Sequence, residues 1–147
     1  MSNTLPAQYQ IFKGKSAARF KISHAQEDYK SGFVYVEFAP VKGKNDNGNR
    51  IYDWESSKIG IKLEIVDLAK LGYALQYGLD CQIYHEYKGT SKVIDLKRSD
   101  GGASPYFLSV TQSTDGAKSN VSVPIASEEA YALLTLFNRA IPSILGW

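Results

Sequence analysis

The most regular alternation of charged and uncharged positions lies in residues 11–22, IFKGKSAARFKI. Side chains along a β-strand point alternately to its two faces. Read as one strand, this stretch places four cations on one face around the small Ala17: Lys13, Lys15, Arg19 and Lys21. The other face carries Phe12, Gly14, Ser16, Ala18, Phe20 and Ile22. The pattern is compatible with a track for an extended polyanion, and equally with an edge strand whose lysines prevent aggregation.

Three more strand-like segments follow in the first half of the chain. Residues 33–40 (FVYVEFAP) alternate, with Tyr35 and Glu37 opposite an apolar face, and we expect Pro40 to end the strand. Residues 41–50 (VKGKNDNGNR) predict a flexible basic hairpin loop. Residues 51–55 (IYDWE) place Tyr52 and Trp54 on one side, and residues 57–63 (SKIGIKL) alternate with Lys58 pointing outward.

The period then changes from that of strands to that of a helix. Residues 64–71 (EIVDLAKL) place their apolar side chains on one helical stripe, and Gly72 or Gly78 is a natural stop. Four more strands are predicted at residues 79–87, 90–98, 106–113 and 120–125, joined by glycine-bearing turns. Ser127 then caps a second helix that has acidic residues in its first turn and Pro142 near its end.

Four strands and a helix, repeated once, predict an α+β fold with two antiparallel four-stranded sheets packed with two helices. We expect a flexible tail at residues 1–8 and a single domain at residues 9–147. The second helix can cover a sheet and still leave Ile144, Leu145 and Trp147 over. A surplus apolar face at this end favours a subunit contact, with folding back onto the chain's own sheet as the alternative.

The composition is that of a soluble globular protein, with 44% hydrophobic and 22% charged residues. The net charge of +2 is unevenly spread, because residues 1–62 hold ten Lys/Arg against six Asp/Glu. A basic first part on a nearly neutral chain indicates a local anion-binding surface. With a single cysteine, no targeting pattern at the start and no apolar run that would span a bilayer, we expect a cytoplasmic or nucleoid-associated protein with no membrane partner.

Enzyme chemistry finds little support in the residues. Cys81 and His85 share a strand face, but the only other histidine is distant, so no metal or other cofactor is expected. Gly14-Lys15-Ser16 lacks the earlier glycine of a P-loop. Asp53 and Glu55 leave a nuclease as the enzymatic alternative, although carboxylates alternating with Tyr52 and Trp54 are expected to point away from them.

The residues fit a surface that binds a single nucleic-acid strand without reading its sequence. Such binding needs cations along the phosphates and flat side chains on which bases stack. The candidate stacking residues are Tyr35, Tyr52 and Trp54, and a buried core position is the alternative for Tyr35 and Trp54. The candidate phosphate contacts are Lys13, Lys15, Arg19, Lys21, Lys58 and Lys62.

Six short motifs follow one another along the chain: KGKSAA (residues 13–18), YDWE (52–55), LG (71–72), PYFLSV (105–110), SVPI (122–125) and AIPSILGW (140–147). In this order they resemble the Whirly family of single-stranded-DNA-binding proteins. The resemblance implies a four-strand, helix, four-strand, helix protomer and a homotetramer held by its helices. It also implies sequence-tolerant single-stranded DNA binding in replication, recombination or transcription, with Lys13, Lys15, Tyr52 and Trp54 at the DNA.

Departures from the family pattern bear on the source and the partner. SAARF stands where the family usually has an aliphatic run. Because we see no plant-type transit peptide and no acidic or aromatic tail after GW, we expect a bacterial, phage or otherwise unsorted relative. Guide-RNA-binding proteins share this architecture, so RNA is an alternative partner. A protein-interaction module whose lysines serve only solubility is the other alternative.

Overall fold

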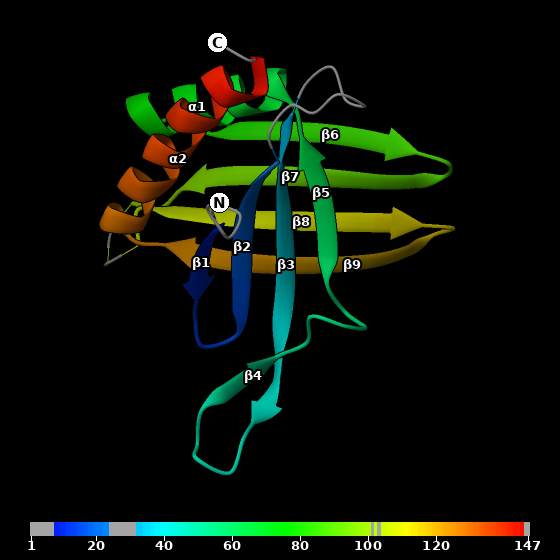
Figure 1. Ribbon diagram of the computed structural model, residues 1–147. Helices are drawn as coiled ribbons and strands as arrows, with labels where there is room; N and C mark the ends of the chain where they lie inside the picture. Colours follow the sequence, from blue (N-terminus) through cyan, green and yellow to red (C-terminus); the bar gives the residue numbers. More distant parts are fainter. Residues whose placement is uncertain (1–7, 24–31, 101, 103, 146–147) are drawn as a thin grey trace, which may run out of the picture.

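The computed structural model describes residues 8–23, 32–100, 102 and 104–145. Two sheets and two helices follow one another along the chain (Figure 1). Sheet 1 contains β1 (Gln8–Phe12), β2 (Ser16–Ser23), β3 (Phe33–Lys44), β4 (Arg50–Tyr52) and β5 (Ile59–Leu63). Sheet 2 contains β6 (Cys81–Tyr87), β7 (Thr90–Arg98), β8 (Tyr106–Thr114) and β9 (Ala117–Ile125). Helix α1 (Ile65–Tyr77) follows sheet 1, and helix α2 (Ser127–Leu145) follows sheet 2.

Every strand pair is antiparallel, which confirms the predicted α+β class. In sheet 1 the long β3 pairs with β5 along its first part and with β4 along its last. Sheet 2 is a simple meander whose tight turns are Lys88-Gly89 and Asp115-Gly116. All four of these turn residues have positive φ, as two-residue hairpins that follow the strand twist require.

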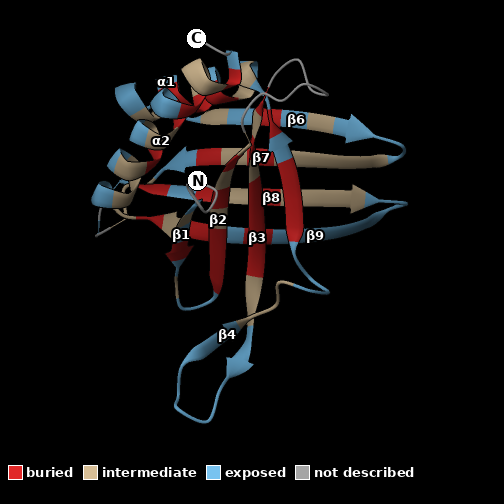
Figure 2. Cartoon of the chain, in the orientation of Figure 1, coloured by how far each residue is buried: buried red, intermediate tan, exposed pale blue. Residues whose placement is uncertain are grey.

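The two sheets cross at a large angle, and the two helices lie side by side at one end of them (Figure 1). Buried residues gather where the facing sides of the sheets and helices meet (Figure 2). Phe20 of β2 meets Phe137 of α2 edge-on, with ring centroids 6.2 Å apart. Because the inner side of sheet 1 is covered in this way, its outer side is the one left for function.

Helix α1 is longer than its eight-residue apolar stripe indicated. It begins with a capping box in which the Glu64 and Asp67 side chains each accept a hydrogen bond from the other's backbone N–H. It ends at Gly78, one of the two predicted stops, which adopts the left-handed conformation at φ +68°.

The prediction of one strand over residues 11–22 is wrong, because Lys13, Gly14 and Lys15 form a turn between β1 and β2. The Lys13 N–H donates to the Ser16 carbonyl at 2.8 Å, and Phe12 pairs with Ala17. Phe12 therefore shares a face with Ala17 and Arg19, whereas unbroken alternation placed it on the opposite face. The charged and uncharged residues still alternate along the sequence through this turn, although the turn changes which face Phe12 occupies. The alternation therefore could not reveal the turn.

The prediction that β3 ends at Pro40 is also wrong. β3 continues to Lys44, and its last part pairs with β4 across a register shift between Val41 and Gly43. After Val41 the strand consists of the exposed Lys42, Gly43 and Lys44, so no apolar alternation marks its end. The expected loop is thus the strand-paired end of a projecting hairpin.

At the other end of the chain, α2 continues through Pro142 to Leu145. Ile144 is only 1% exposed, and its carbonyl accepts a hydrogen bond from the Gly32 N–H at 3.3 Å. The expectation that Ile144 is free for a subunit contact is therefore wrong, because it packs on its own chain. Leu145 is exposed, while Trp147 and residues 1–7 of the expected tail lie outside the described residues. β1 begins at Gln8.

Candidate nucleic-acid interface

The outer face of sheet 1 gathers most of the predicted binding residues. Directly paired residues of neighbouring strands share a face, so the register fixes which side chains lie together. One row across the sheet runs from Arg19 through Glu37 to Gly60. The next row runs from Lys21 through Tyr35 to Lys62. Arg19, Lys21 and Tyr35, predicted to face outward, therefore do so as neighbours.

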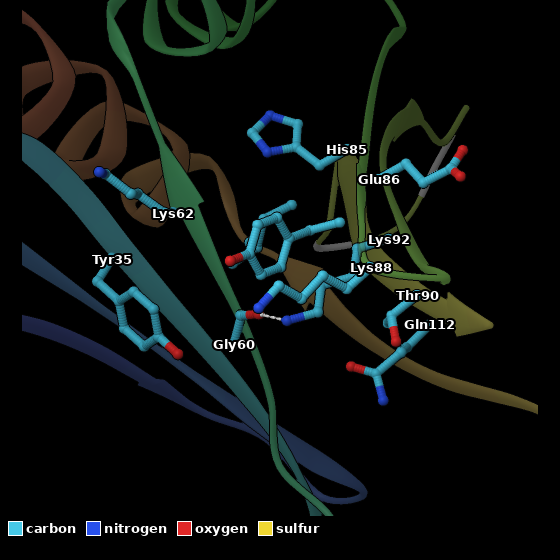
Figure 3. A pocket seen from close by; sticks show the side chains of 11 residues that line it. Tyr35, Gly60, Lys62, His85, Glu86, Lys88, Thr90, Lys92 and Gln112 are labelled. Carbon is cyan, nitrogen blue, oxygen red and sulfur yellow. Dashed lines mark hydrogen bonds between the residues drawn. The ribbon is translucent and has the colours of Figure 1, made fainter. Parts of the chain in front are cut away.

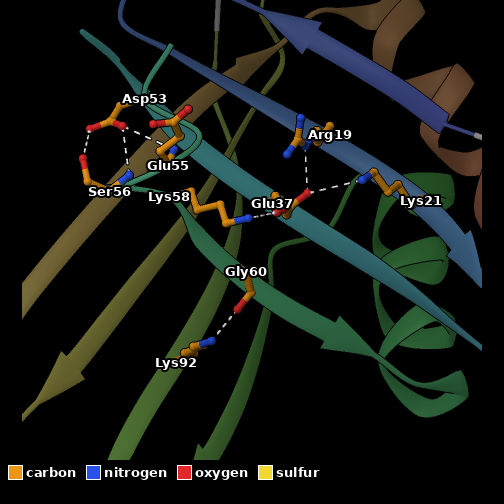
Figure 4. Close-up of polar contacts among 9 residues, drawn as sticks. All are labelled: Arg19, Lys21, Glu37, Asp53, Glu55, Ser56, Lys58, Gly60 and Lys92. Carbon is orange, nitrogen blue, oxygen red and sulfur yellow. Dashed lines mark hydrogen bonds and ion pairs between the residues drawn. The ribbon is translucent and has the colours of Figure 1, made fainter.

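Glu37 is the centre of this surface (Figure 4). Its Oε1 accepts from Arg19 Nε at 2.7 Å and lies 3.8 Å from Lys21 Nζ, while its Oε2 lies 2.8 Å from Lys58 Nζ. Glu37 is only 3% exposed, whereas its partners keep 21–40% of their side-chain surface exposed. We call Arg19, Lys21, Glu37 and Lys58 the Glu37 cluster. With three cations around one carboxylate, the Glu37 cluster has a net positive charge.

The carboxylate of Glu37 stays ionised despite its burial. Burial by itself raises the pKa of this group. Hydrogen bonds from Arg19 and Lys58, together with their charges, outweigh the burial and hold the pKa of Glu37 below its ordinary value. The cluster therefore fixes the direction of three long cationic side chains that would otherwise move freely.

Trp54 lies over the Glu37 cluster and not in the core. It follows β4 in a turn, where its N–H donates to the Tyr52 carbonyl at 3.1 Å. The Arg19 guanidinium carbon lies 4.1 Å from the centroid of the Trp54 ring, a distance typical of a cation–π contact. The alternative of a buried core indole is excluded, because Trp54 is only partly covered. A flat ring thus sits directly above a row of cations.

Tyr35 provides a second flat ring on the same face. Its hydroxyl oxygen lies only 2.1 Å from where a Cβ on Gly60 would stand, so the ring crosses the sheet over that glycine. Any larger residue at position 60 would displace Tyr35. The ring is partly exposed, which excludes the alternative of a buried core position.

The remaining predicted residues lie at the turn between β1 and β2. Lys13 Nζ is bound to Glu129 Oε1 at 2.7 Å, in the first turn of α2, while Lys15 is exposed. The Tyr52 hydroxyl donates to the Lys13 carbonyl at 2.6 Å, and its ring lies 5.5 Å from that of Phe12. Tyr52 therefore holds the turn in place. Eight of the nine predicted residues form two groups, one at the turn and one at the Glu37 cluster with Tyr35 and Trp54. The ninth, Lys62, is paired with Tyr35 across β3 and β5.

A cleft of about 760 Å³ opens beside β5, where sheet 2 extends past the edge of sheet 1 (Figure 3). Tyr35, Gly60 and Lys62 line one side of it. On the other side a polar row crosses sheet 2 from His85 through Lys92 to Gln112. The cleft adjoins the Glu37 cluster, so cations and rings continue from the open face of sheet 1 into a concave site.

The sequence reasoning missed Lys92, which closes the inner end of this cleft. Its Nζ donates to the Gly60 carbonyl, and burial lowers its pKa. Lys92 stands in phase with the buried Ile94 and Leu96, so it is a cation at a position where alternation calls for an apolar residue. A cation at an apolar position of the alternation is the sequence signal by which Lys92 could have been recognised.

Asp53, one of the carboxylates considered for a nuclease, accepts hydrogen bonds from residues of its own turn. Its Oδ1 accepts from the Ser56 N–H at 3.0 Å, and its Oδ2 from the Ser56 hydroxyl at 2.8 Å. Hydrogen bonds from the Ser56 backbone and side chain are the main cause of a lowered pKa for Asp53. Within the described ranges, no three His, Cys, Asp or Glu side chains gather in a way that could hold a metal ion.

A family model described as Whirly transcription factor matches residues 11–136. The chain belongs to the Whirly family. It is 28% identical over 156 residues to the chloroplastic single-stranded DNA-binding protein WHY1 of Zea mays. It is 27% identical over 157 residues to WHY3 of Arabidopsis thaliana, which carries the same description. Each match covers 95% of this chain and 56% of the relative, so the chain spans about half the length of these proteins.

The crystal structure of WHY3 from Arabidopsis thaliana has the same fold as this Whirly protein. The two align with a TM-score of 0.81 and 23% identity, over 99% of this chain and 92% of the other. Both units of antiparallel strands followed by a helix that the motifs imply are present. The first has five strands and not four, because β1 and β2 are separate, and the second has four. No helix in the described part of this Whirly chain combines the length and apolar character needed to cross a bilayer.

Proposed function

We propose that this Whirly protein binds single-stranded DNA without strict sequence preference and has no catalytic role. Support comes from the names of its relatives and from one geometric observation. That observation is the placing of two partly exposed rings, Trp54 and Tyr35, beside cations that Glu37 holds on the open face of sheet 1. An unpaired strand lying on this face would meet both phosphate partners and stacking surfaces, which is what sequence-tolerant binding requires.

The cleft beside β5 gives this surface a place for an extruded base. Tyr35 and Tyr87 bring aromatic rings to its lining, and Gln112 offers an amide. A paired duplex presents its bases stacked inside the helix, so it could use the cations and not the rings. Preference for single strands therefore follows from the rings and from the concave site. Replication, recombination and transcription are the processes that expose such strands.

Labelled oligo-dT is expected to bind more tightly than duplex DNA of equal length. Its affinity should fall steeply with salt, because each phosphate contact releases counterions and contributes about −0.7 to the slope of log K against log salt for a single strand. Fluorescence anisotropy across a salt series measures both properties.

The same titration separates this proposal from its alternatives. Equal or tighter duplex binding would contradict the preference for single strands, and a flat salt response would remove the phosphate contacts. Oligo-U as a competitor tests RNA as the partner. Absence of any binding would leave a protein-interaction module.

We also propose that the protein assembles as a homotetramer through its helical layer. Tyr73 and Tyr77 of α1 are 61% and 59% exposed, with ring centroids 4.8 Å apart, and Tyr131 of α2 is 73% exposed. Exposed aromatic side chains on one layer indicate a surface that another chain can cover. The contact we propose therefore involves both helices and not the buried Ile144.

Light scattering is expected to give about four times the chain mass of 16.3 kDa. Tyr73→Asp/Tyr131→Asp should lower that mass, because unpaired carboxylates would be buried at the contact. Tyr84→Asp, a change at a similarly exposed tyrosine on sheet 2, is the control and should leave the mass unchanged. A wild-type mass of one chain would contradict the proposal.

A further inference from the structure

Residues 41–52 form a hairpin that projects from the body of the protein (Figure 1), and we call it the β3–β4 arm. It consists of the end of β3, a tight loop and β4. All residues from Lys42 to Ile51 are exposed (Figure 2). Residues 42–51 therefore place no side chain in the core, so core packing does not explain their sequence.

The arm carries three cations and one carboxylate. Lys42, Lys44 and Arg50 point from its two strands, and Asp46 lies in the loop. In the part of the chain that the structure describes, no carboxylate lies within 4.0 Å of the charged groups of Lys42, Lys44 or Arg50. This contrasts with the Glu37 cluster and with Lys13, whose cations are held by buried or helical carboxylates. The positive charges of Lys42, Lys44 and Arg50 can therefore interact with a binding partner.

Two of these cations oppose each other. Lys44 and Arg50 are direct partners across the β3–β4 ladder. Like charges at directly opposite positions of an antiparallel pair destabilise it. No apolar packing of the exposed residues offsets this cost, whereas an anion placed between or beside the two groups would relieve it. The pair thus indicates an anionic partner.

The arm is nevertheless held in a defined position. At its base, the Val41 N–H donates to the Lys15 carbonyl at 2.8 Å, and Tyr52 is bonded to the Lys13 carbonyl. At its tip, Asn45 Oδ1 accepts from the Asn47 and Asn49 N–H groups at 3.0 and 2.9 Å. These bonds fix the backbone from which the cations project, so the arm itself need not be ordered when the cations bind.

The base of the arm also joins it to the candidate interface. Arg50 Nη2 lies 3.8 Å from where a Cβ on Gly14 would stand, which places this guanidinium beside the exposed Lys15 turn. Tyr52 ends the arm, and Trp54 follows it directly over Arg19. A nucleic-acid strand that lies on the outer face of sheet 1 and passes the turn between β1 and β2 would therefore run along the arm.

We propose that the β3–β4 arm is a second phosphate-binding element, which extends the interface on sheet 1 to a longer nucleic-acid strand. This inference rests on the proposed single-strand binding and adds a prediction about length. Short oligonucleotides contact only the Glu37 cluster, Trp54 and Tyr35. Longer ones gain contacts from Lys42, Lys44 and Arg50, and those contacts carry no base preference because they are made to phosphates alone.

The test compares Lys42→Gln/Lys44→Gln with the wild-type protein on oligo-dT of increasing length. Arg50 is kept, because it packs beside the turn. For long oligo-dT, losing two phosphate contacts should reduce the magnitude of the salt slope by about 1.4 and the affinity at 0.1 M salt by roughly ten- to thirty-fold. For the shortest oligo-dT that the wild-type protein still binds, affinity and slope should stay as they are. The control Lys97→Gln/Lys118→Gln removes the same charge from two exposed positions of sheet 2 and should change neither.

Three results would overturn the inference. The first is an arm variant that binds every length like the wild-type protein, or a control that loses as much as the arm variant. The second is a lower mass of the arm variant in light scattering without DNA, which would show that the arm contacts a neighbouring copy. The third is a wild-type protein that binds no oligo-dT. It would remove the proposed function as well, whereas the first two leave that function standing.

Discussion

Glu37→Gln is expected to lower the free energy of unfolding by about 1.5–3 kcal/mol at neutral pH, the range for hydrogen bonds to charged groups. The amide keeps the shape of the carboxylate but loses its charge. Its NH₂ group takes the place of one oxygen and would face the cations that now donate to that oxygen, Arg19 at Oε1 or Lys58 at Oε2. The loss is smaller than for a fully buried ion pair, because Arg19, Lys21 and Lys58 can regain water at their exposed sides. Urea unfolding of both proteins measures it.

The same comparison has a defined pH dependence. Folding lowers the pKa of Glu37, so the stability that this carboxylate contributes is fully present above the pKa of an unfolded glutamate, about 4.3. It is lost as the pH falls through the lower pKa of the folded state. The difference between Glu37→Gln and the wild-type protein should therefore shrink below about pH 4.3. Glu55→Gln, at an exposed carboxylate of the neighbouring turn, is the control, and an equal loss there would contradict the role of Glu37.

Trp54→Ala is expected to weaken oligo-dT binding by roughly 5- to 150-fold, corresponding to about 1–3 kcal/mol for the loss of one stacked base. The indole carries no charge, so the slope of log K against log salt should stay unchanged. This separates its effect from that of the Lys42→Gln/Lys44→Gln variant, which changes the slope. Anisotropy titrations at three or more salt concentrations measure both quantities.

Trp54→Phe is the matched control, because it keeps a flat ring over Arg19 and should retain most of the affinity. Since the wild-type ring is only partly covered, the alanine variant is expected to fold, which circular dichroism checks. Unchanged affinity in a folded alanine variant would mean that bases stack elsewhere. Tyr35, whose ring crosses Gly60, would then be the first ring to examine.

Among the predicted binding residues, those within regular strands were placed well by the sequence. Arg19 and Lys21 point outward from β2 and Tyr35 from β3, because alternation within an unbroken strand is geometrically fixed. Lys13 and Lys15 were assigned to the same row as Arg19, and the turn at Gly14 separates them from it. The Tyr52 ring lies against Phe12 and the Trp54 ring against Arg19, and Trp54 stands in a turn and not in the predicted strand.

Glu37 and Lys92 show what periodicity cannot supply. The outward position of Glu37 was predicted, but its burial under three cations depends on neighbours from β2 and from the segment before β5. Lys92 reaches the Gly60 carbonyl only because sheet 2 crosses beneath the edge of β5. Both contacts join residues that are distant in sequence, so no local pattern records them.

The amino-acid sequence alone determined the order of strands and helices, the tight turns of sheet 2 and, through six short motifs, the family. The strands, helices and turns follow from local properties, namely side-chain period and residues that tolerate positive φ, and the family follows from short motifs in a fixed order along the chain. Among the described residues, the tertiary structure decided which cations lie against carboxylates and which do not, where the cleft lies and that residues 41–52 form a projecting arm. Those features depend on how two sheets cross and on which edges they expose, and that geometry arises only when distant segments pack together.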